Sequence, residues 1–277
     1  HGEVLRYDTS AAFDEPLSWD AYDPGANGVG ITPDGYKSGV FDGRYVYFTP
    51  SHTNDGYHAE VLRYDPQGEF DDPDSWDAYD YGTECGADCN DPGGFATSVF
   101  DGRYIYFGPG FSAAEGRETL RYDTTADFSS VSSWLTFDPQ SQGLGTWVAS
   151  FAGAVFDGRH IYFMPHVDFD ISTEVVLSYD TAASFIDPLS WSVFDPASAG
   201  VGTGIDGHHT GVFDGRYVYF APTNWNYPEL VHGEVLRYDT GLPAPVPTVS
   251  EWGMAVMLLL ILSAGVIVLA KRQSIRE

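Results

Sequence analysis

Short runs of large apolar and aromatic residues recur along most of this chain, separated by turns rich in Gly, Pro and Asp. The clearest stretch has one run ending at Phe41, a second over 44–48, a third over 60–65 and a short fourth over 75–80. Asp42-Gly43 stands between the first two runs. This dipeptide is typical of a two-residue type I′ hairpin turn, because such a turn needs positive φ at both positions. The pattern therefore predicts four β-strands in each stretch of this kind.

The same motifs return at a nearly constant spacing. Leu-Arg-Tyr-Asp begins at residues 5, 62, 120 and 236, and Leu-Ser-Tyr-Asp begins at residue 177. Ser-Trp has its Trp at residues 19, 76, 134 and 191, and Phe-Asp-Gly-Arg begins at residues 41, 100, 156 and 213. The strand residues are apolar on both faces, which requires a sheet that is covered on both sides. Four-stranded antiparallel units at this period predict an all-β fold, a β-propeller over residues 1–240.

The succession of motifs within each unit resembles the kelch repeat. Asp42-Gly43 with Tyr47, then Tyr64-Asp65, then Trp76, and their copies in the other units, carry the resemblance. Kelch repeats have a glycine pair after the second strand, where this chain has Thr49-Pro50. The resemblance implies kelch-like propeller blades, with this departure from the kelch pattern.

The number of blades is open, because the chain contains five copies of the third strand and four copies of each other strand. A four-bladed ring would use the N-terminal fourth strand and leave one third strand over. That surplus, with a first residue that is not Met, favours a piece of a parent protein that has more blades. The alternative is a compact four-bladed ring with a frayed or swapped N-terminal strand.

The composition changes after Thr240. Residues 241–249 form a Pro-rich linker and the start of a further motif, and residues 250–277 contain a 17-residue run from Met254 to Ala270 that is apolar apart from Ser263. Such a run is near the lower limit for a membrane-spanning helix. Lys271-Arg272 follows directly and places that end in the cytoplasm, so the repeats are expected outside.

This tail resembles the IPTL-CTERM sorting segment, a relative of the PEP-CTERM signals that exosortase-type enzymes handle. The resemblance is carried by an eight-residue motif, the apolar run and the basic end. The motif consists of Val246, Pro247, Thr248, Val249, Ser250, Glu251, Trp252 and Gly253. The resemblance implies export to the cell envelope or outer surface, an exosortase-type partner, and membrane anchoring through the C-terminal helix. Release of the protein after processing is a variant of the same interpretation. A plain membrane anchor is the alternative.

The net charge of −27 narrows the range of partners. An acidic surface repels phosphate backbones, which excludes a nucleic-acid partner. Most arginines before the tail stand at repeat positions, where pairing with a neighbouring Asp is expected rather than a ring of cationic sites. Cys85 and Cys89 are too few ligands for a structural zinc site, so in an exported protein they predict one local disulfide.

Two loops that precede innermost strands share a pattern, Asp34-Gly-Tyr-Lys-Ser-Gly-Val and Asp206-Gly-His-His-Thr-Gly-Val. They are expected to border the central channel and to hold a polar or cation-binding site there. Trp225-Asn-Tyr227 adds aromatic faces and an amide, which suit sugar stacking. Ordinary turn chemistry and loop packing are the alternatives. The candidate ligand-binding residues are Asp34, Tyr36, Asp206, His208, His209, Trp225 and Tyr227.

Asp168 and Asp170 lie beside His166 and are weak metal candidates, so calcium is the one cofactor considered, although the D-x-D-x-D-G calcium loop does not occur. No G-x-S-x-G or P-loop sequence occurs either. The sequence predicts a non-catalytic surface module that binds a glycan or another envelope or matrix component. The alternatives are an extracellular enzyme acting on polysaccharide or protein at the propeller mouth, and a structural surface protein without a specific ligand.

Overall fold

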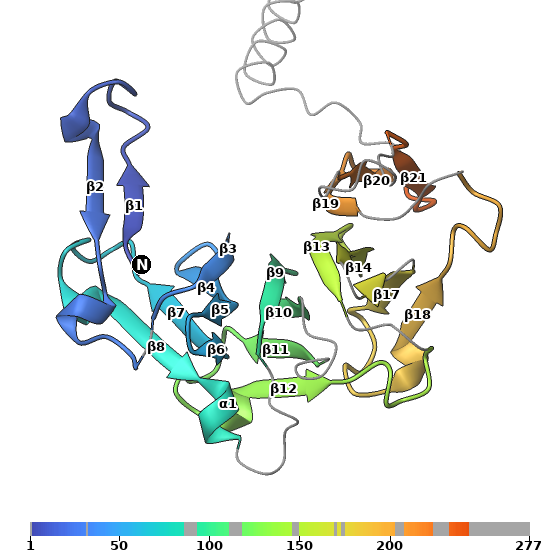
Figure 1. Ribbon diagram of the computed structural model, residues 1–277, viewed down its shortest axis with the longest axis horizontal. Coiled ribbons are helices and arrows are strands. Elements are labelled where there is room, and N and C mark those ends of the chain that lie inside the picture. Colours follow the sequence, from blue (N-terminus) through green and yellow to red (C-terminus); the bar gives the residue numbers. More distant parts are fainter. Residues whose placement is uncertain are drawn as a thin grey trace, which may run out of the picture.

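The computed structural model describes residues 2–31, 33–85, 93–110, 118–145, 150–168, 171–172, 175–202, 208–223 and 233–243. Over these ranges the chain is built from antiparallel sheets that follow one another in an arc (Figure 1). The prediction of an all-β fold made of four-stranded antiparallel units is confirmed for three consecutive units. We number the repeat units 1 to 5 along the chain.

Units 2, 3 and 4 each form a four-stranded sheet, with the strands in the predicted order. Unit 2 consists of β3 (Tyr36–Phe41), β4 (Val46–Pro50), β7 (Glu60–Tyr64) and β8 (Trp76–Asp80). Unit 3 consists of β9 (Phe95–Phe100), β10 (Tyr104–Pro109), β11 (Thr119–Asp123) and β12 (Trp134–Phe137). Unit 4 consists of β13 (Phe151–Phe156), β14 (His160–Pro165), β17 (Val176–Asp180) and β18 (Trp191–Phe194).

The two outer units are partial sheets over the described ranges. Unit 1 pairs β1 (Val4–Tyr7) with β2 (Trp19–Tyr22), which correspond to the third and fourth strands of the other units. Unit 5 contains β19 (His208–Phe213), β20 (Tyr217–Pro222) and β21 (Leu236–Asp239), the first three strands. The described ranges also contain two small hairpins, β5 (His52–Thr53) with β6 (Gly56–Tyr57) and β15 (Val167–Asp168) with β16 (Ile171–Ser172), one short α-helix, α1 (Tyr81–Glu84), and short 3-10 turns such as Pro73–Ser75.

An Asp-Gly turn joins the first two strands of each complete unit, one residue away from the predicted position. The backbone N–H of Asp42 donates to the carbonyl of Tyr45 at 3.2 Å, so Gly43 and Arg44 are the central residues. Gly43 has φ of +99°, which a glycine adopts without strain. The Asp42 carboxylate accepts from the backbone N–H groups of Arg44 and Tyr45 and from the hydroxyl of Tyr47. The aspartate therefore accepts the hydrogen bonds of the turn although it precedes the two central residues.

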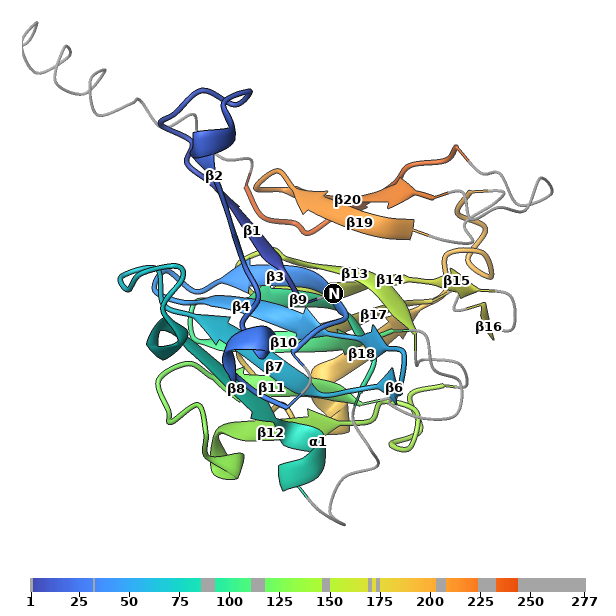
Figure 2. The same cartoon turned by 60° about the vertical axis from the view of Figure 1, so that its left-hand side comes forward.

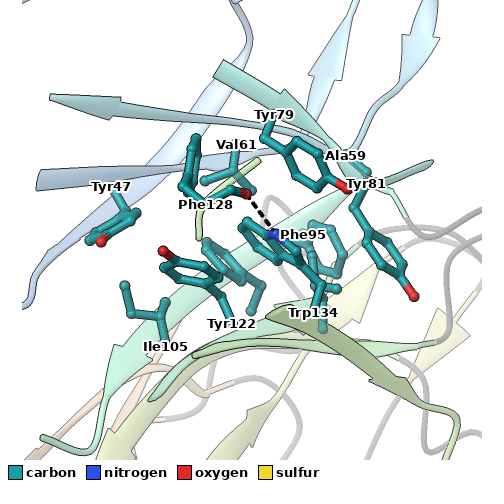
Figure 3. Close-up of a cluster of buried hydrophobic side chains, with 12 residues drawn as sticks. Tyr47, Ala59, Val61, Tyr79, Tyr81, Phe95, Ile105, Tyr122, Phe128 and Trp134 are labelled. Atoms are coloured by element: carbon teal, nitrogen blue, oxygen red, sulfur yellow. Dashed lines mark hydrogen bonds between the residues drawn. The ribbon is translucent and has the colours of Figure 1, made fainter. Parts of the chain in front are cut away.

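Aromatic side chains hold neighbouring units together. Trp134 of unit 3 stacks on Tyr79 of unit 2 with ring centroids 5.4 Å apart, and its indole N–H donates to the carbonyl of Phe128 at 3.0 Å (Figure 3). Phe128 and Trp134 are each 2% exposed. The same stacking joins Trp76 to Tyr22 and Trp191 to Phe137. Because one aromatic cluster repeats at the boundaries between units 1 and 2, 2 and 3, and 3 and 4, these sheets bury their broad faces against one another, as the pattern of apolar residues predicts.

Six of the eight repeat arginines pair with aspartates, as expected. Arg103 lies 2.7 Å from Asp123, and Arg159 and Arg216 each lie 2.8 Å from the equivalent aspartates of their own units. These pairs lie at the surface, where water and salt screen the charges, so they add little to the stability of the fold. No helix within the described ranges is long and apolar enough to cross a membrane. The predicted sorting motif and apolar run, from residue 246 onward, lie outside those ranges.

Candidate functional site

The innermost strands of units 2 to 5 share one opening. β3 lies against β9, β9 against β13 and β13 against β19. Together they line a cavity of about 440 Å³. Its lining consists of Lys37, Ser38, Ala96, Thr97, Ala152, Gly153, Ala154, His209 and Thr210. We call this cavity the channel.

A β-bulge at the same place in all four units aims one side chain at the channel. In unit 2, Tyr36 pairs with Pro50 and Ser38 pairs with Thr49, which leaves Lys37 as the extra residue. The equivalent register shifts leave out Ala96, Ala152 and His209. All four extra residues line the channel. A bulge bends its strand and redirects side chains, so the pairing itself selects which position of each unit becomes a channel residue.

Small residues allow the inner strands to approach one another closely. A Cβ atom built on Gly153 would lie 2.5 Å from the backbone carbonyl oxygen of His209 in the next unit. Hydroxyl groups also cross between units, because Ser38 donates to Thr49 at 2.8 Å and Thr49 donates to Ser98 at 2.7 Å. Thr49 is fully buried, so this chain of hydroxyls fixes β3 and β4 relative to β9.

The channel lining is polar and slightly cationic in an otherwise acidic protein. None of the nine lining residues named above carries a carboxylate, whereas Lys37 is the single lysine before residue 271. Burial lowers the pKa of His209, and the positive charge of Lys37 lowers it further. His209 is therefore neutral at pH 7. Its ring lies 5.5 Å from that of His166, which is buried and lies 3.4 Å from the Ser150 hydroxyl.

The predicted candidates next to the channel divide between its lining and the surrounding core. His209 lines the channel, while His208 is 1% exposed and lies edge-on to Phe220. Tyr36 is outside the lining and packs on Phe48 and His58. Burial raises the pKa of Tyr36, and the nearby carboxylates of Glu60 and Asp34 raise it further. Of these candidates, the structure thus brings His209 alone to the cavity wall, because the bulge in β19 leaves His209 as the extra residue.

Several other candidates cannot be placed. Asp206, Trp225, Tyr227, Asp170 and Cys89 lie outside the described residues, so the predicted sugar contacts, D-x-D site and disulfide remain predictions. Asp168 belongs to β15, and Cys85 directly follows α1. Within the described part of the chain, no group of three or more His, Cys, Asp or Glu residues could hold a metal ion.

The sequence contains one signal for the position of the channel residues. Lys37, Ala96, Ala152 and His209 each stand four residues before the Phe of Phe-Asp-Gly-Arg. This shared offset marks the bulge position, although the bulge itself becomes visible only once the strands are paired. Comparison with family models gives no match to this chain, and no curated protein sequence matches it.

Proposed function

We propose that this chain is an exported β-propeller that acts as a non-catalytic binding module, and that its channel takes a single acidic sugar unit such as a uronic acid. Repeated four-stranded sheets that stack face to face along an arc support the propeller. The kelch-like motifs and the sorting-type tail support surface display. In this proposal, the tail anchors the protein in the membrane and is recognised by the exosortase-type partner.

The composition of the channel lining carries the proposal. A volume of about 440 Å³ suits one or two sugar rings. Ser38, Thr97 and Thr210 offer hydroxyls that can donate to or accept from sugar hydroxyls. The positively charged ammonium group of Lys37 attracts a carboxylate. The strongly acidic remainder of the protein repels long anionic chains, which favours a terminal unit over the interior of a polyanion.

An enzyme acting at the same opening is less well supported. Sugar hydrolysis generally uses a pair of carboxyl groups that face the substrate. The nine residues that line the channel include neither Asp nor Glu. A binding role requires no such pair and agrees with the lining as it is described.

Binding of glucuronate and galacturonate disaccharides, measured by calorimetry on the full chain in a non-ionic detergent, tests the proposal. Lys37→Gln should weaken binding about tenfold, the value of one charge-assisted hydrogen bond, and Lys37→Arg should restore most of it. Arg44→Gln removes the same charge from an exposed arginine outside the channel lining, and should leave binding unchanged. Equal binding of the neutral disaccharides, or an equal loss in the Arg44→Gln protein, would refute the proposal.

A further inference from the structure

The small hairpin formed by β5 and β6 is attached to units 2 and 3 where their inner strands begin. Within the hairpin, His52 pairs with Tyr57. On one side, the backbone carbonyl of Gly35 accepts a hydrogen bond from the N–H of His52 at 3.1 Å. On the other side, the carbonyl of His58 accepts from the N–H of Gly94 at 3.2 Å. The hairpin is therefore hydrogen-bonded to the chain that leads into both β3 and β9.

Both attachment points lie next to the channel. Gly35 and Gly94 each stand two residues before a channel residue, which is Lys37 in unit 2 and Ala96 in unit 3. Two residues of extended chain span at most about 7 Å. Figure 2 shows β6 at the same end of the sheets as β15 and β16, the hairpin of unit 4. The β5–β6 hairpin therefore borders one mouth of the channel.

This hairpin presents an aromatic ring to solvent. Tyr57 is 41% exposed, whereas Tyr47 and Tyr106, which donate to turn aspartates, are fully buried. A Cβ atom built on Gly94 would lie 2.5 Å from Cδ1 of Tyr57, so the ring lies directly against the glycine backbone. The ring of His52 contacts it edge-on, with ring centroids 5.3 Å apart. These contacts fix the position of the Tyr57 ring and leave part of its surface free.

The aromatic pair is not needed to form a hairpin at this place. In unit 4, β15 and β16 stand between the second and third strands, as β5 and β6 do in unit 2. Their corresponding residues are Val167 and Ser172 in place of His52 and Tyr57. The exposed ring is thus a feature of unit 2, which is also the unit that contributes Lys37 to the channel.

We propose that the β5–β6 hairpin is a second sugar position, in which Tyr57 stacks on a neutral sugar ring linked to the uronate in the channel. This inference rests on the binding role proposed for the channel. A neutral sugar ring presents C–H groups on its faces, and these pack against the face of an aromatic ring. Asp55 is exposed at the turn of the hairpin, where its carboxylate repels a second acidic ring. The ligand class is therefore a chain end with a uronate as its last unit and a neutral sugar next to it.

Calorimetry on the full chain in a non-ionic detergent, with glucuronate, glucuronosyl-glucose and diglucuronate as probes, tests the second position. Glucuronosyl-glucose should bind about fivefold more tightly than glucuronate, the value of one aromatic stacking contact. Tyr57→Ala should remove that gain and leave glucuronate binding unchanged, and Tyr57→Phe should keep the gain. Phe194→Ala is the matched control, because it removes a 52% exposed ring from the fourth strand of unit 4 and should leave both affinities unchanged.

The possible results separate the hairpin from the channel. Glucuronate binding without a gain for glucuronosyl-glucose, or a gain that persists in Tyr57→Ala, overturns the hairpin position and leaves the channel proposal standing. An equal loss of glucuronate and glucuronosyl-glucose binding in Tyr57→Ala also overturns it, because the ring would then support the channel rather than a second sugar. Diglucuronate that binds as tightly as glucuronosyl-glucose overturns the selection of a neutral second ring. If none of the three sugars binds, both proposals fail.

Discussion

Replacing the turn aspartate of unit 3, Asp101→Ala, should destabilise the protein by about 3 kcal/mol. Its carboxylate accepts from the backbone N–H groups of Arg103 at 2.8 Å and Tyr104 at 2.7 Å, and from the hydroxyl of Tyr106 at 2.7 Å. Water can replace the carboxylate at the exposed backbone N–H of Arg103 and, in part, at the half-buried N–H of Tyr104, because both belong to the turn between β9 and β10. The Tyr106 side chain is fully buried, so its hydroxyl would lose a partner that water does not replace, at a cost of about 1–3 kcal/mol.

A double-mutant cycle in urea separates these contributions. Tyr106→Phe removes the buried hydroxyl, so Asp101→Ala should cost about 1–2 kcal/mol less in the Tyr106→Phe background than in the original chain. Asp101→Asn keeps an acceptor for the turn and should cost less than Asp101→Ala. Burial and the nearby Asp101 carboxylate raise the pKa of Tyr106, so its hydroxyl remains a donor over the whole measurable pH range. Additive effects of the two substitutions would refute the reasoning, because they would show that the hydrogen bond carries no coupling energy.

Three further outcomes are expected. Trp134→Ala should cost about 3–5 kcal/mol in urea unfolding, because the ring fills the boundary between units 2 and 3, and a loss below about 1 kcal/mol would contradict that packing. Gly153→Ala should lower the free energy of unfolding by about 1–3 kcal/mol and weaken uronate binding, since the new methyl group would clash with the His209 carbonyl. Unchanged thermal stability would contradict the close approach of the two strands. The lowered pKa of His209 means that its folded form binds a proton less readily than its unfolded form. Stability from His209 is thus complete above pH about 6.5 and declines as the pH falls below it. Protonation of His209 should also strengthen uronate binding. A binding profile that is flat between pH 7.5 and 5.5, or a pH-dependent profile that persists in His209→Gln, would contradict the assignment.

Much of the sheet organisation could be predicted from the sequence because each unit repeats the same chemistry. Asp-Gly followed by alternating aromatic residues defines a hairpin locally, and five copies of Tyr-Asp set the period. The stacking of Trp134 on Tyr79 also follows from residue types, since large rings at regular spacing need one another for burial.

The site was less accessible to sequence reasoning for a physical reason. His208 and His209 are adjacent and chemically alike, and a one-residue bulge decides which of them reaches the channel. A bulge depends on the pairing of two strands, so no local pattern within β19 specifies it. The local sequence likewise does not predict that Phe194 and Trp19 are exposed, because the equivalent residues of the other units are buried.

In the four hairpins around the channel, the residues that build the fold differ from the residues that face the channel. The residues that fix each unit, such as the turn aspartate and the Tyr that donates to it, recur in every unit with a complete hairpin. The bulge positions share their backbone geometry yet hold four side chains of three kinds, Lys37, Ala96, Ala152 and His209. The frame does not require a particular side chain there, since alanine occupies two of the four positions. Lys37 and His209 bring nitrogen groups to a cavity that also has hydroxyl groups in its lining, and we propose that a small anionic ligand recognises this asymmetry within the repeated frame.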